Sequence, residues 1–275
     1  MKKSEQRRAL VAAVAAARAA GALMRKNLHA PKKINEETLH DIKLELDVRC
    51  QKLIERMLHQ AFLKISLLGE EGESGSANSE HRWVVDPIDG TVNFAHGIPH
   101  ACVSIALQVR SAECGVRNQR TLHVTHHPSH VTMLGVVYDP FTSELWTAIR
   151  GGPARLNGKI IHASQRRKLG EAVVSIGFSK SKANLERSLP LFCFLSRRAR
   201  KIRIMGSAAL ALTYVATGRF DAYIERRISL WDIAAGGLIL ECAGGKFYAE
   251  PVAGYHRYRM VASNGLLHRQ LRVPK

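Results

Sequence analysis

Two carboxylates lie close together in the segment Asp86 to Thr91, which reads Asp-Pro-Ile-Asp-Gly-Thr. The proline restricts the backbone between Asp86 and Asp89, and Gly90 allows a sharp turn or a close approach to a ligand. Both side chains can therefore point at one spot, and carboxylate oxygens are ligands that Mg²⁺ prefers. If a helix begins at Thr91, its unpaired backbone N–H groups face the same spot and favour a phosphate. Alone, the segment is equally compatible with an Asp-Pro turn and an Asp helix cap.

Further carboxylates stand at the ends of other expected elements. Glu70 and Glu71 follow a short strand candidate, and Asp232 opens a long apolar helix. Each has a structural explanation, since Glu70 can be a solvated turn residue and Asp232 a helix cap worth about 1 kcal/mol. Carboxylates gathered at several such ends would repel one another unless cations neutralised them. The combination therefore predicts an acidic cluster that binds cations.

Hydrophobic periodicity predicts the elements that position these residues. The first half is expected to begin helix, loop, helix, with the second helix at 44–63, followed by strands at 65–68 and 82–85 that run directly into the acidic residues. Strands at 102–109 and 134–138 are expected to pair in one antiparallel sheet. The second half alternates strands at 173–176, 202–204 and 222–224 with helices at 188–198, 208–216 and 232–242. This alternation indicates an α/β fold.

No internal repeat or low-complexity linker divides the chain. Residues 1–275 are therefore expected to form one unit with two lobes, 1–152 and 153–275, that share a cleft. The connection 110–132 is long for a hairpin, and it contains His123, His126, His127 and His130. A solvated basic loop explains these histidines more simply than a metal site, because no regular element fixes the imidazoles.

Composition narrows the class of protein and its partners. The chain of 275 residues is 46% hydrophobic, and its net charge of +18 favours polyanions, phosphorylated metabolites or an anionic membrane surface. Five cysteines without CxxC spacing predict reduced thiols and a cytoplasmic location. The basic start before the apolar run 10–17 can be interpreted as a signal peptide, but the alanine-rich run is more typical of an ordinary first helix reaching Leu28. No apolar run approaches the ~20 residues that span a bilayer, so no membrane insertion is expected.

Three segments of the sequence resemble signature segments of the inositol monophosphatase family. They are Gly69-Glu70-Glu71, the segment from Trp83 to Phe94 (Trp-Val-Val-Asp-Pro-Ile-Asp-Gly-Thr-Val-Asn-Phe), and Trp231 to Gly236 (Trp-Asp-Ile-Ala-Ala-Gly). The likeness runs from the first helix to Ala262-Ser-Asn-Gly265. It implies a layered α/β/α/β/α sandwich, usually a homodimer, and a phosphatase with Mg²⁺ as cofactor and Li⁺ as inhibitor.

The resemblance also implies metal ligands and catalytic residues. Glu70, Asp86 and the backbone carbonyl of Ile88 would hold one Mg²⁺, and Asp86, Asp89 and Asp232 would hold a second. Thr91 would orient the attacking water together with Asp47, which places Asp47, Glu70 and Thr91 in the catalytic group.

Substrate contacts are implied in the same way. Gly90 and Thr91 would offer backbone N–H groups to the phosphate, and Glu225 would bind substrate hydroxyls. The loop Gly206-Ser207-Ala208 would line the substrate pocket, to which Asp89 and Asp232 also contribute.

Two departures from the family pattern are visible. The segment Asp41 to Asp47 reads Asp-Ile-Lys-Leu-Glu-Leu-Asp, whereas the family commonly shows Asp-x-Val-Thr-x-x-Asp. The role of Asp47 therefore rests on the matching acidic ends, and Lys43 or Glu45 can shape the local site differently. The connection 110–132 exceeds the family's usual hairpin by roughly 20 residues, and we expect it to alter the surface or a partner contact rather than the chemistry.

The resemblance predicts Mg²⁺-dependent release of phosphate from myo-inositol 1-phosphate by metal-activated water. The same chemistry on adenosine 3',5'-bisphosphate, fructose 1,6-bisphosphate or histidinol phosphate is the alternative within the family. An RNA-binding role is the alternative from another class, based on the basic clusters 197–203 and Arg226-Arg227, although no aromatic-rich RNA motif accompanies them. Asp89→Asn is expected to abolish turnover and leave the fold intact, on the assumption that Asp89 lies in an exposed cleft.

Overall fold

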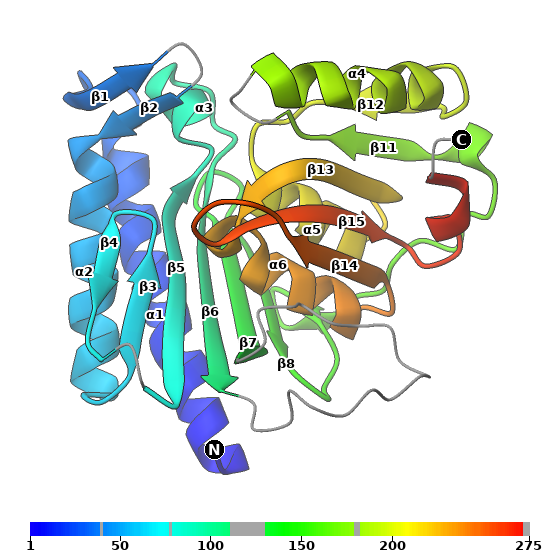
Figure 1. Cartoon of the computed structure of the whole chain (residues 1–275). Helices are drawn as coiled ribbons and strands as arrows, with labels where there is room; N and C mark the ends of the chain where they lie inside the picture. Colours follow the sequence, from blue (N-terminus) through cyan, green and yellow to red (C-terminus); the bar gives the residue numbers. More distant parts are fainter. Residues whose placement is uncertain (39–40, 77–78, 111–129, 179–181, 272–275) are drawn as a thin grey trace.

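The computed structural model describes residues 1–38, 41–76, 79–110, 130–178 and 182–271. Eight strands form the larger sheet, in the order β10-β9-β8-β7-β6-β5-β3-β4 (Figure 1). They are β3 (Ser66–Gly69), β4 (Gly72–Ser74), β5 (His81–Asp89), β6 (Cys102–Arg110), β7 (His130–Asp139), β8 (Glu144–Ile149), β9 (Arg155–Leu156) and β10 (Lys159–Ile160). The predicted antiparallel pairing of the strands near 102–109 and 134–138 is confirmed by β6 and β7.

Five strands form the second sheet, in the order β12-β11-β13-β15-β14. They are β11 (Val173–Ile176), β12 (Lys201–Arg203), β13 (Ala222–Ser229), β14 (Lys246–Pro251) and β15 (Arg257–Ser263). A separate hairpin consists of β1 (Ile34–Thr38) and β2 (Asp41–Leu44). The helices are α1 (Lys3–Asn27), α2 (Glu45–Ala61), α3 (Thr91–Ala95), α4 (Lys182–Ser196), α5 (Ala208–Ala216) and α6 (Leu230–Cys242), with short 3-10 turns at Leu169–Glu171 and His268–Leu271.

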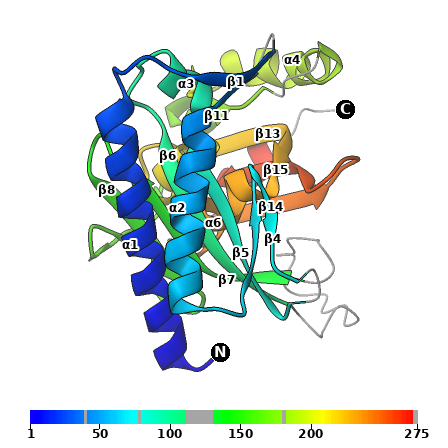
Figure 2. The same ribbon diagram turned by 90° about the vertical axis from the view of Figure 1, so that its left-hand side faces the viewer.

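The sheets and helices alternate in layers. Helices α1 and α2 cover one face of the eight-stranded sheet, and this interface forms one apolar core (Figure 2). Helices α5 and α6 lie between the two sheets and form a second core with both of them. Helix α4 covers the outer face of the five-stranded sheet over a third core. The predicted α/β/α/β/α sandwich is therefore confirmed.

Helix α1 packs through a stripe of small residues. Ala9, Ala13, Ala16, Ala20 and Met24 are fully buried against the sheet and α2, because alanine lets a helix approach its neighbours closely and has the best helix propensity. Leu10 and Val14 are only partly buried beside this stripe. The alanine-rich run thus contributes to the folded core. None of the described helices is long and apolar enough to cross a membrane.

Several elements differ from the sequence-based expectation. Strands β14 and β15 were not predicted, since they gain their order from antiparallel pairing with each other and with β13 rather than from a local pattern. Helix α4 begins at Lys182 rather than near 188, and Pro190 lies inside it. A proline usually marks the first turn of a helix, which explains the late predicted start. Residues 111–129, with His123, His126 and His127, lie outside the described part of the chain.

Candidate active site

A β-bulge brings the two aspartates of β5 to the same side. In a regular strand, residues three apart point to opposite faces. The register between β5 and β6 shifts between Asp86 and Asp89, so the extra residue re-aims the side chains. Ile88 donates its backbone N–H to Asp86 Oδ1 at 3.0 Å and fixes the first carboxylate. The bulge therefore lets both carboxylates face the same spot, as the sequence suggested.

Asp232 reaches the same place from α6. Its Oδ2 accepts a hydrogen bond from the backbone N–H of Ser229 at 2.9 Å, in a capping arrangement at the helix start. One carboxylate oxygen from each of Asp86, Asp89 and Asp232 lies within 4.8 Å of the others. Asp232 can therefore cap α6 and also belong to the carboxylate cluster. Hard oxygen donors at this spacing fit a divalent cation such as Mg²⁺.

Burial and mutual repulsion disfavour the charged forms of these aspartates. Burial is the largest cause of a pKa of Asp86 well above its usual value, and Glu70, Asp89 and Asp232 raise it further. Burial and Asp232 also raise the pKa of Asp89 to about 7, against hydrogen bonds that lower it. Packed carboxylates of this kind are stabilised by positive charge, which a bound cation supplies.

The carboxylate of Asp89 also holds the start of α5. It accepts hydrogen bonds from Ser207 Oγ at 2.7 Å, from the backbone N–H of Ala208 at 3.2 Å and from that of Ala209 at 2.6 Å. Asp89 is buried. The assumption of an exposed cleft was therefore wrong, because Asp89→Asn would also replace an acceptor oxygen facing these donors with an NH₂ group.

A cavity of about 740 Å³ opens over the carboxylate cluster. It lies where the ends of the eight-stranded sheet, α3 and the five-stranded sheet meet, and its size is ordinary for a small-molecule site. Most of the predicted site residues line it, namely Glu70, Asp86, Ile88, Asp89, Gly90, Thr91, Gly206, Ser207, Ala208, Glu225 and Asp232. Residues distant in sequence are therefore brought together around one space.

Gly90 makes the turn between β5 and α3. Its φ of 98° lies in the left-handed region that favours glycine, and a methyl group there would come within 2.9 Å of the carbonyl oxygen of His100. Helix α3 does begin at Thr91, as the sequence indicated. The hydroxyl of Thr91 donates to the carbonyl oxygen of Ile88 at 2.9 Å, and that carbonyl has a second lone pair for another partner.

Asp47 is the exception among the predicted site residues. It is buried in the first turn of α2, where its Oδ2 accepts the backbone N–H of Leu44 at 2.8 Å. It is not among the residues that line the cavity. Glu45 forms an ion pair with Lys33 at 2.7 Å, away from the carboxylate cluster.

Glu225 is positioned by its neighbours on the five-stranded sheet. Tyr223, two residues earlier on the same face of β13, donates its hydroxyl to Glu225 Oε2. A side chain at Gly177, which follows β11, would collide with the same carboxylate. The buried tyrosine and the glycine together fix where Glu225 enters the cavity.

Sequence reasoning missed other residues of the cavity wall. They include Asn93, Ser175, Gly177, Phe178, Met205, Tyr223, Arg227, Trp231 and Arg257. Arg227 belongs to a basic pair that was interpreted as a candidate nucleic-acid contact. Arg227 is only five residues from Asp232 in the sequence. This short separation was the one indication in the sequence that Arg227 lies near the site.

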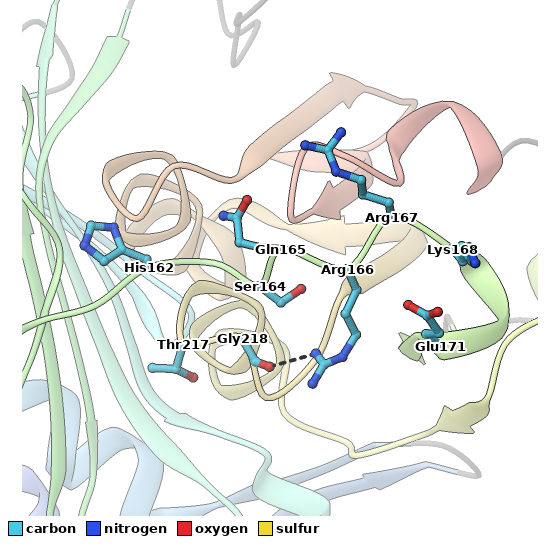
Figure 3. A pocket seen from close by; sticks show the side chains of 9 residues that line it. All are labelled: His162, Ser164, Gln165, Arg166, Arg167, Lys168, Glu171, Thr217 and Gly218. Atoms are coloured by element: carbon cyan, nitrogen blue, oxygen red, sulfur yellow. Dashed lines mark hydrogen bonds between the residues drawn. The ribbon is translucent and has the colours of Figure 1, made fainter.

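A second, more open hollow of about 620 Å³ lies apart from the carboxylates. Figure 3 shows the residues that line it: His162, the segment 164–168, Glu171, and Thr217 and Gly218 directly after α5. Arg166 donates to the carbonyl oxygen of Gly218 at 3.2 Å and pairs with the buried Asp221 at 3.0 Å. This hollow has a basic rim and lacks the clustered acids that a divalent cation requires.

The fold is shared with proteins of known structure. The inositol monophosphatase from Anabaena (Nostoc) sp. PCC 7120 has a TM-score of 0.77 and 32% identity, over 95% of this chain and 92% of that one. The extragenic suppressor protein suhB from Bartonella henselae has a TM-score of 0.80 and 31% identity, over 94% and 95% of the two chains. The protein is therefore a phosphatase, a hydrolase of phosphate esters.

The particular family follows from the sequence matches. The model of the inositol monophosphatase family matches residues 5–116 and 118–269, and the chain belongs to this family. An inositol-1-monophosphatase of Rhizobium meliloti is 38% identical over 203 residues, 73% of this chain and 69% of its own. A protein named Nus factor SuhB from Pseudomonas aeruginosa is 36% identical over 241 residues, 85% of this chain and 82% of its own. Members of this family use metal ions and act on small phosphorylated substrates.

Proposed function

We propose that the protein hydrolyses small phosphomonoesters with Mg²⁺ and that myo-inositol 1-phosphate is a substrate. The observation that carries the proposal is the set of three carboxylates, with oxygens within 4.8 Å, at the base of the cavity. The name of the Rhizobium meliloti relative, inositol-1-monophosphatase, supports the choice of substrate.

The proposal places two divalent cations at the carboxylates. Glu70, Asp86 and the carbonyl of Ile88 would hold one ion, and Asp86, Asp89 and Asp232 a second, so that Asp86 is shared. All five residues line the cavity. When bound, such ions neutralise the phosphate and lower the pKa of water toward neutrality.

The protein's own groups orient the reactants. The backbone N–H groups of Gly90 and Thr91 would bind the phosphate at the turn into α3, and Glu225, held by Tyr223, would accept hydrogen bonds from substrate hydroxyls. Thr91 can still accept a hydrogen bond from water while its own proton is donated to Ile88. Asp47 would support this water from the start of α2, and its place outside the cavity wall makes its role the first to test.

A substrate panel tests the proposal. We expect phosphate release from myo-inositol 1-phosphate with Mg²⁺, loss of release with a chelator, and inhibition by Li⁺. Adenosine 3',5'-bisphosphate, fructose 1,6-bisphosphate and histidinol phosphate complete the panel. Failure of Mg²⁺ to support hydrolysis of any of them would refute the proposed function, and a strict preference for another substrate would refute the choice of inositol phosphate.

Assembly and location are part of the proposal. The family resemblance favours a homodimer, which light scattering on the purified protein tests directly. The four described cysteines, Cys50, Cys102, Cys193 and Cys242, are free thiols. Free thiols support a reducing compartment and hence the cytoplasm, because disulfides form mainly in oxidising ones.

A nucleic-acid contact is the second candidate. Two basic segments adjoin at the edge of the five-stranded sheet, since Lys201 donates its N–H to the carbonyl oxygen of Ala172 at 3.3 Å. The exposed cations there are Arg166, Arg167, Lys168, Arg197, Arg198, Arg200, Lys201 and Arg203. Relatives named Nus factor SuhB give this candidate its context. Affinity for RNA should fall steeply between 50 and 200 mM salt, by roughly a thousandfold if six or more phosphates are contacted. Absence of binding at low salt would eliminate it.

A further inference from the structure

Two arginines belong to the wall of the active-site cavity. Arg227 comes from β13 and Arg257 from the first residue of β15, and both side chains are partly buried. Neither has a role in the metal site or in the binding of the scissile phosphate described above. Their presence in a cavity whose base is strongly acidic requires an explanation of its own.

A second β-bulge, in β13, places Arg227 in the cavity wall. Strand β13 pairs with β15 at Glu225 with Met260 and again at Ile228 with Tyr258, so three steps on one strand oppose two on the other. The inserted residue lies within the pair Arg226-Arg227. Of these two, Arg227 lines the cavity, whereas Arg226 does not.

Few hydrogen bonds engage the two guanidinium groups. Arg227 Nη1 donates to the carbonyl oxygen of Ala253 at 2.8 Å, and Arg257 Nη1 donates to Ser229 Oγ. Arg257 also lies with its Cζ 6.0 Å from the centre of the Trp231 ring. Each guanidinium has five N–H donors, so most of them remain available for a ligand.

Neither arginine forms an ion pair in the described part of the chain, although acidic residues line the same cavity. Neither Arg227 nor Arg257 takes part in any of the ion pairs found among residues 1–38, 41–76, 79–110, 130–178 and 182–271. By contrast, Arg150, Arg166, Arg219 and Arg259 each pair with an acidic side chain. Partly buried charges are stabilised by an opposite charge, and guanidinium groups suit carboxylate and phosphate oxygens in particular.

We propose that Arg227 and Arg257 form a subsite for a second anionic group of the substrate. The inference rests on the proposed phosphatase function and specifies its substrate class. The scissile phosphate lies at the carboxylate cluster with its cations, and a second phosphate or a carboxylate of the same molecule lies at the two arginines. A cavity of about 740 Å³ accommodates a sugar-sized molecule that carries both groups.

The subsite orders substrates by the charge at their far end. A bisphosphate such as fructose 1,6-bisphosphate is favoured over the matched fructose 1-phosphate, and 3-phosphoglycerate over glycerol 3-phosphate. Inositol 1-phosphate, whose ring is uncharged away from the phosphate, stands between these substrates and histidinol phosphate, whose ammonium group the arginines repel. The two matched pairs also distinguish a second phosphate from a carboxylate as the preferred group.

The decisive measurement is the ratio of kcat/KM for the member of each pair with two anionic groups to that for the member with one. Arg227→Gln should reduce this ratio on the order of 10-fold, because a hydrogen bond between charged groups is lost. Arg226→Gln is the matched control, since it removes the same charge from the adjacent residue outside the cavity wall. It corrects for the general attraction of anions by a protein of net charge +18. An equal effect of both variants, or a wild-type ratio of one or less, would overturn the subsite.

A binding measurement separates this proposal from the proposed function. Thermal stabilisation by fructose 1,6-bisphosphate, compared with fructose 1-phosphate, reports the second anionic group without turnover. If no phosphomonoester is hydrolysed but the bisphosphate stabilises wild type more strongly, and Arg227→Gln removes the difference, the subsite stands while the phosphatase proposal fails. Equal stabilisation by the two sugars, in wild type and in both variants, contradicts the subsite whatever the activity.

Discussion

The acidic residues of the cavity combine structural and chemical roles. Asp232 caps α6 and Asp89 binds the start of α5, while one oxygen of each also lies in the carboxylate cluster. In Asp232, Oδ2 accepts the backbone hydrogen bond, whereas both oxygens of Asp89 already accept hydrogen bonds from the start of α5. A carboxylate oxygen has more than one lone pair, so an oxygen that accepts a hydrogen bond can still bind a cation. Asp86 is the most direct test of the cluster, since its Oδ1 accepts a hydrogen bond from within its own strand, from the backbone N–H of Ile88.

Replacing Asp86 with asparagine should separate stability from activity. We expect Mg²⁺-dependent hydrolysis to fall at least 100-fold, since a shared ligand is lost. The metal-free protein should become more stable, because the buried carboxylate that Glu70, Asp89 and Asp232 repel is neutralised. The thermal midpoint should rise by about 2–4 °C for each kcal/mol of relieved repulsion. A phosphate-release assay and thermal unfolding in chelator check the two effects, and retained activity would contradict the metal assignment.

The raised pKa values also predict how metal-free stability depends on pH. A carboxyl group whose folded pKa is raised binds its proton more tightly in the folded state, so it stabilises the fold at low pH. For Asp89 this contribution should be complete below its usual pKa near 3.8 and lost as pH rises through about 7. Thermal unfolding in chelator from pH 5 to 8 should show the decline. Excess Mg²⁺ should flatten it, and a metal-independent profile would argue against cation binding at the cluster.

At the scale of elements, the site depends on how closely α6 packs on β7. Gly135 of β7 faces the backbone of α6, and a methyl group there would lie 2.7 Å from the carbonyl oxygen of Ala235. Asp232 stands one turn earlier on the same helix. The position of the Asp232 carboxylate therefore depends on the packing of α6 against Gly135, a residue that takes no part in the reaction.

Gly135→Ala should push α6 away from the sheet. We expect a loss of about 1–3 kcal/mol in the free energy of unfolding, as for other overpacked cores, together with weaker Mg²⁺ binding through the displaced Asp232. Denaturant unfolding and a Mg²⁺ titration measure the two effects. Gly170→Ala is the control, because its nearest neighbour would be an ordinary 3.8 Å away. Equal effects of the two substitutions would remove the packing argument.

At the scale of the whole molecule, the cavity and the two residues that flank the long connection, Arg110 and His130, lie at opposite ends of β6. Cys102 at the start of β6 pairs with Asp89, and Arg110 at its end pairs with His130 of β7. Eight residue steps along the strand separate them by roughly 26 Å. The ends that residues 111–129 must join are thus adjacent partners in the sheet.

Replacing residues 111–129 with a two-residue Asn-Gly turn should leave the chemistry intact. Such turns connect antiparallel neighbours, and the cavity residues keep their positions at the far end of the sheet. We expect kcat/KM for the best substrate of the panel to stay within about threefold of wild type, a change of under 1 kcal/mol. A large loss of activity in a folded variant would show that this connection takes part in catalysis.

The sequence by itself determined the family, the acidic residues and the alternation of elements. Those features are local, since Asp-Pro-Ile-Asp-Gly-Thr and the turn at Gly90 express backbone preferences of a few neighbouring residues. The sequence could not show that a bulge turns Asp86 and Asp89 to one side, because strand register depends on the partner strand. It also could not show β14 and β15, which are stabilised by pairing.

Only the tertiary structure decided which charges share the cavity. Arg227 and Arg226 are indistinguishable by composition, yet the bulge in β13 places only one of them in the cavity wall. Asp47 matched the family pattern at its acidic ends, yet it lies outside that wall. The physical reason is that burial and charge balance are properties of the space between elements, and that space exists only once distant strands and helices have packed.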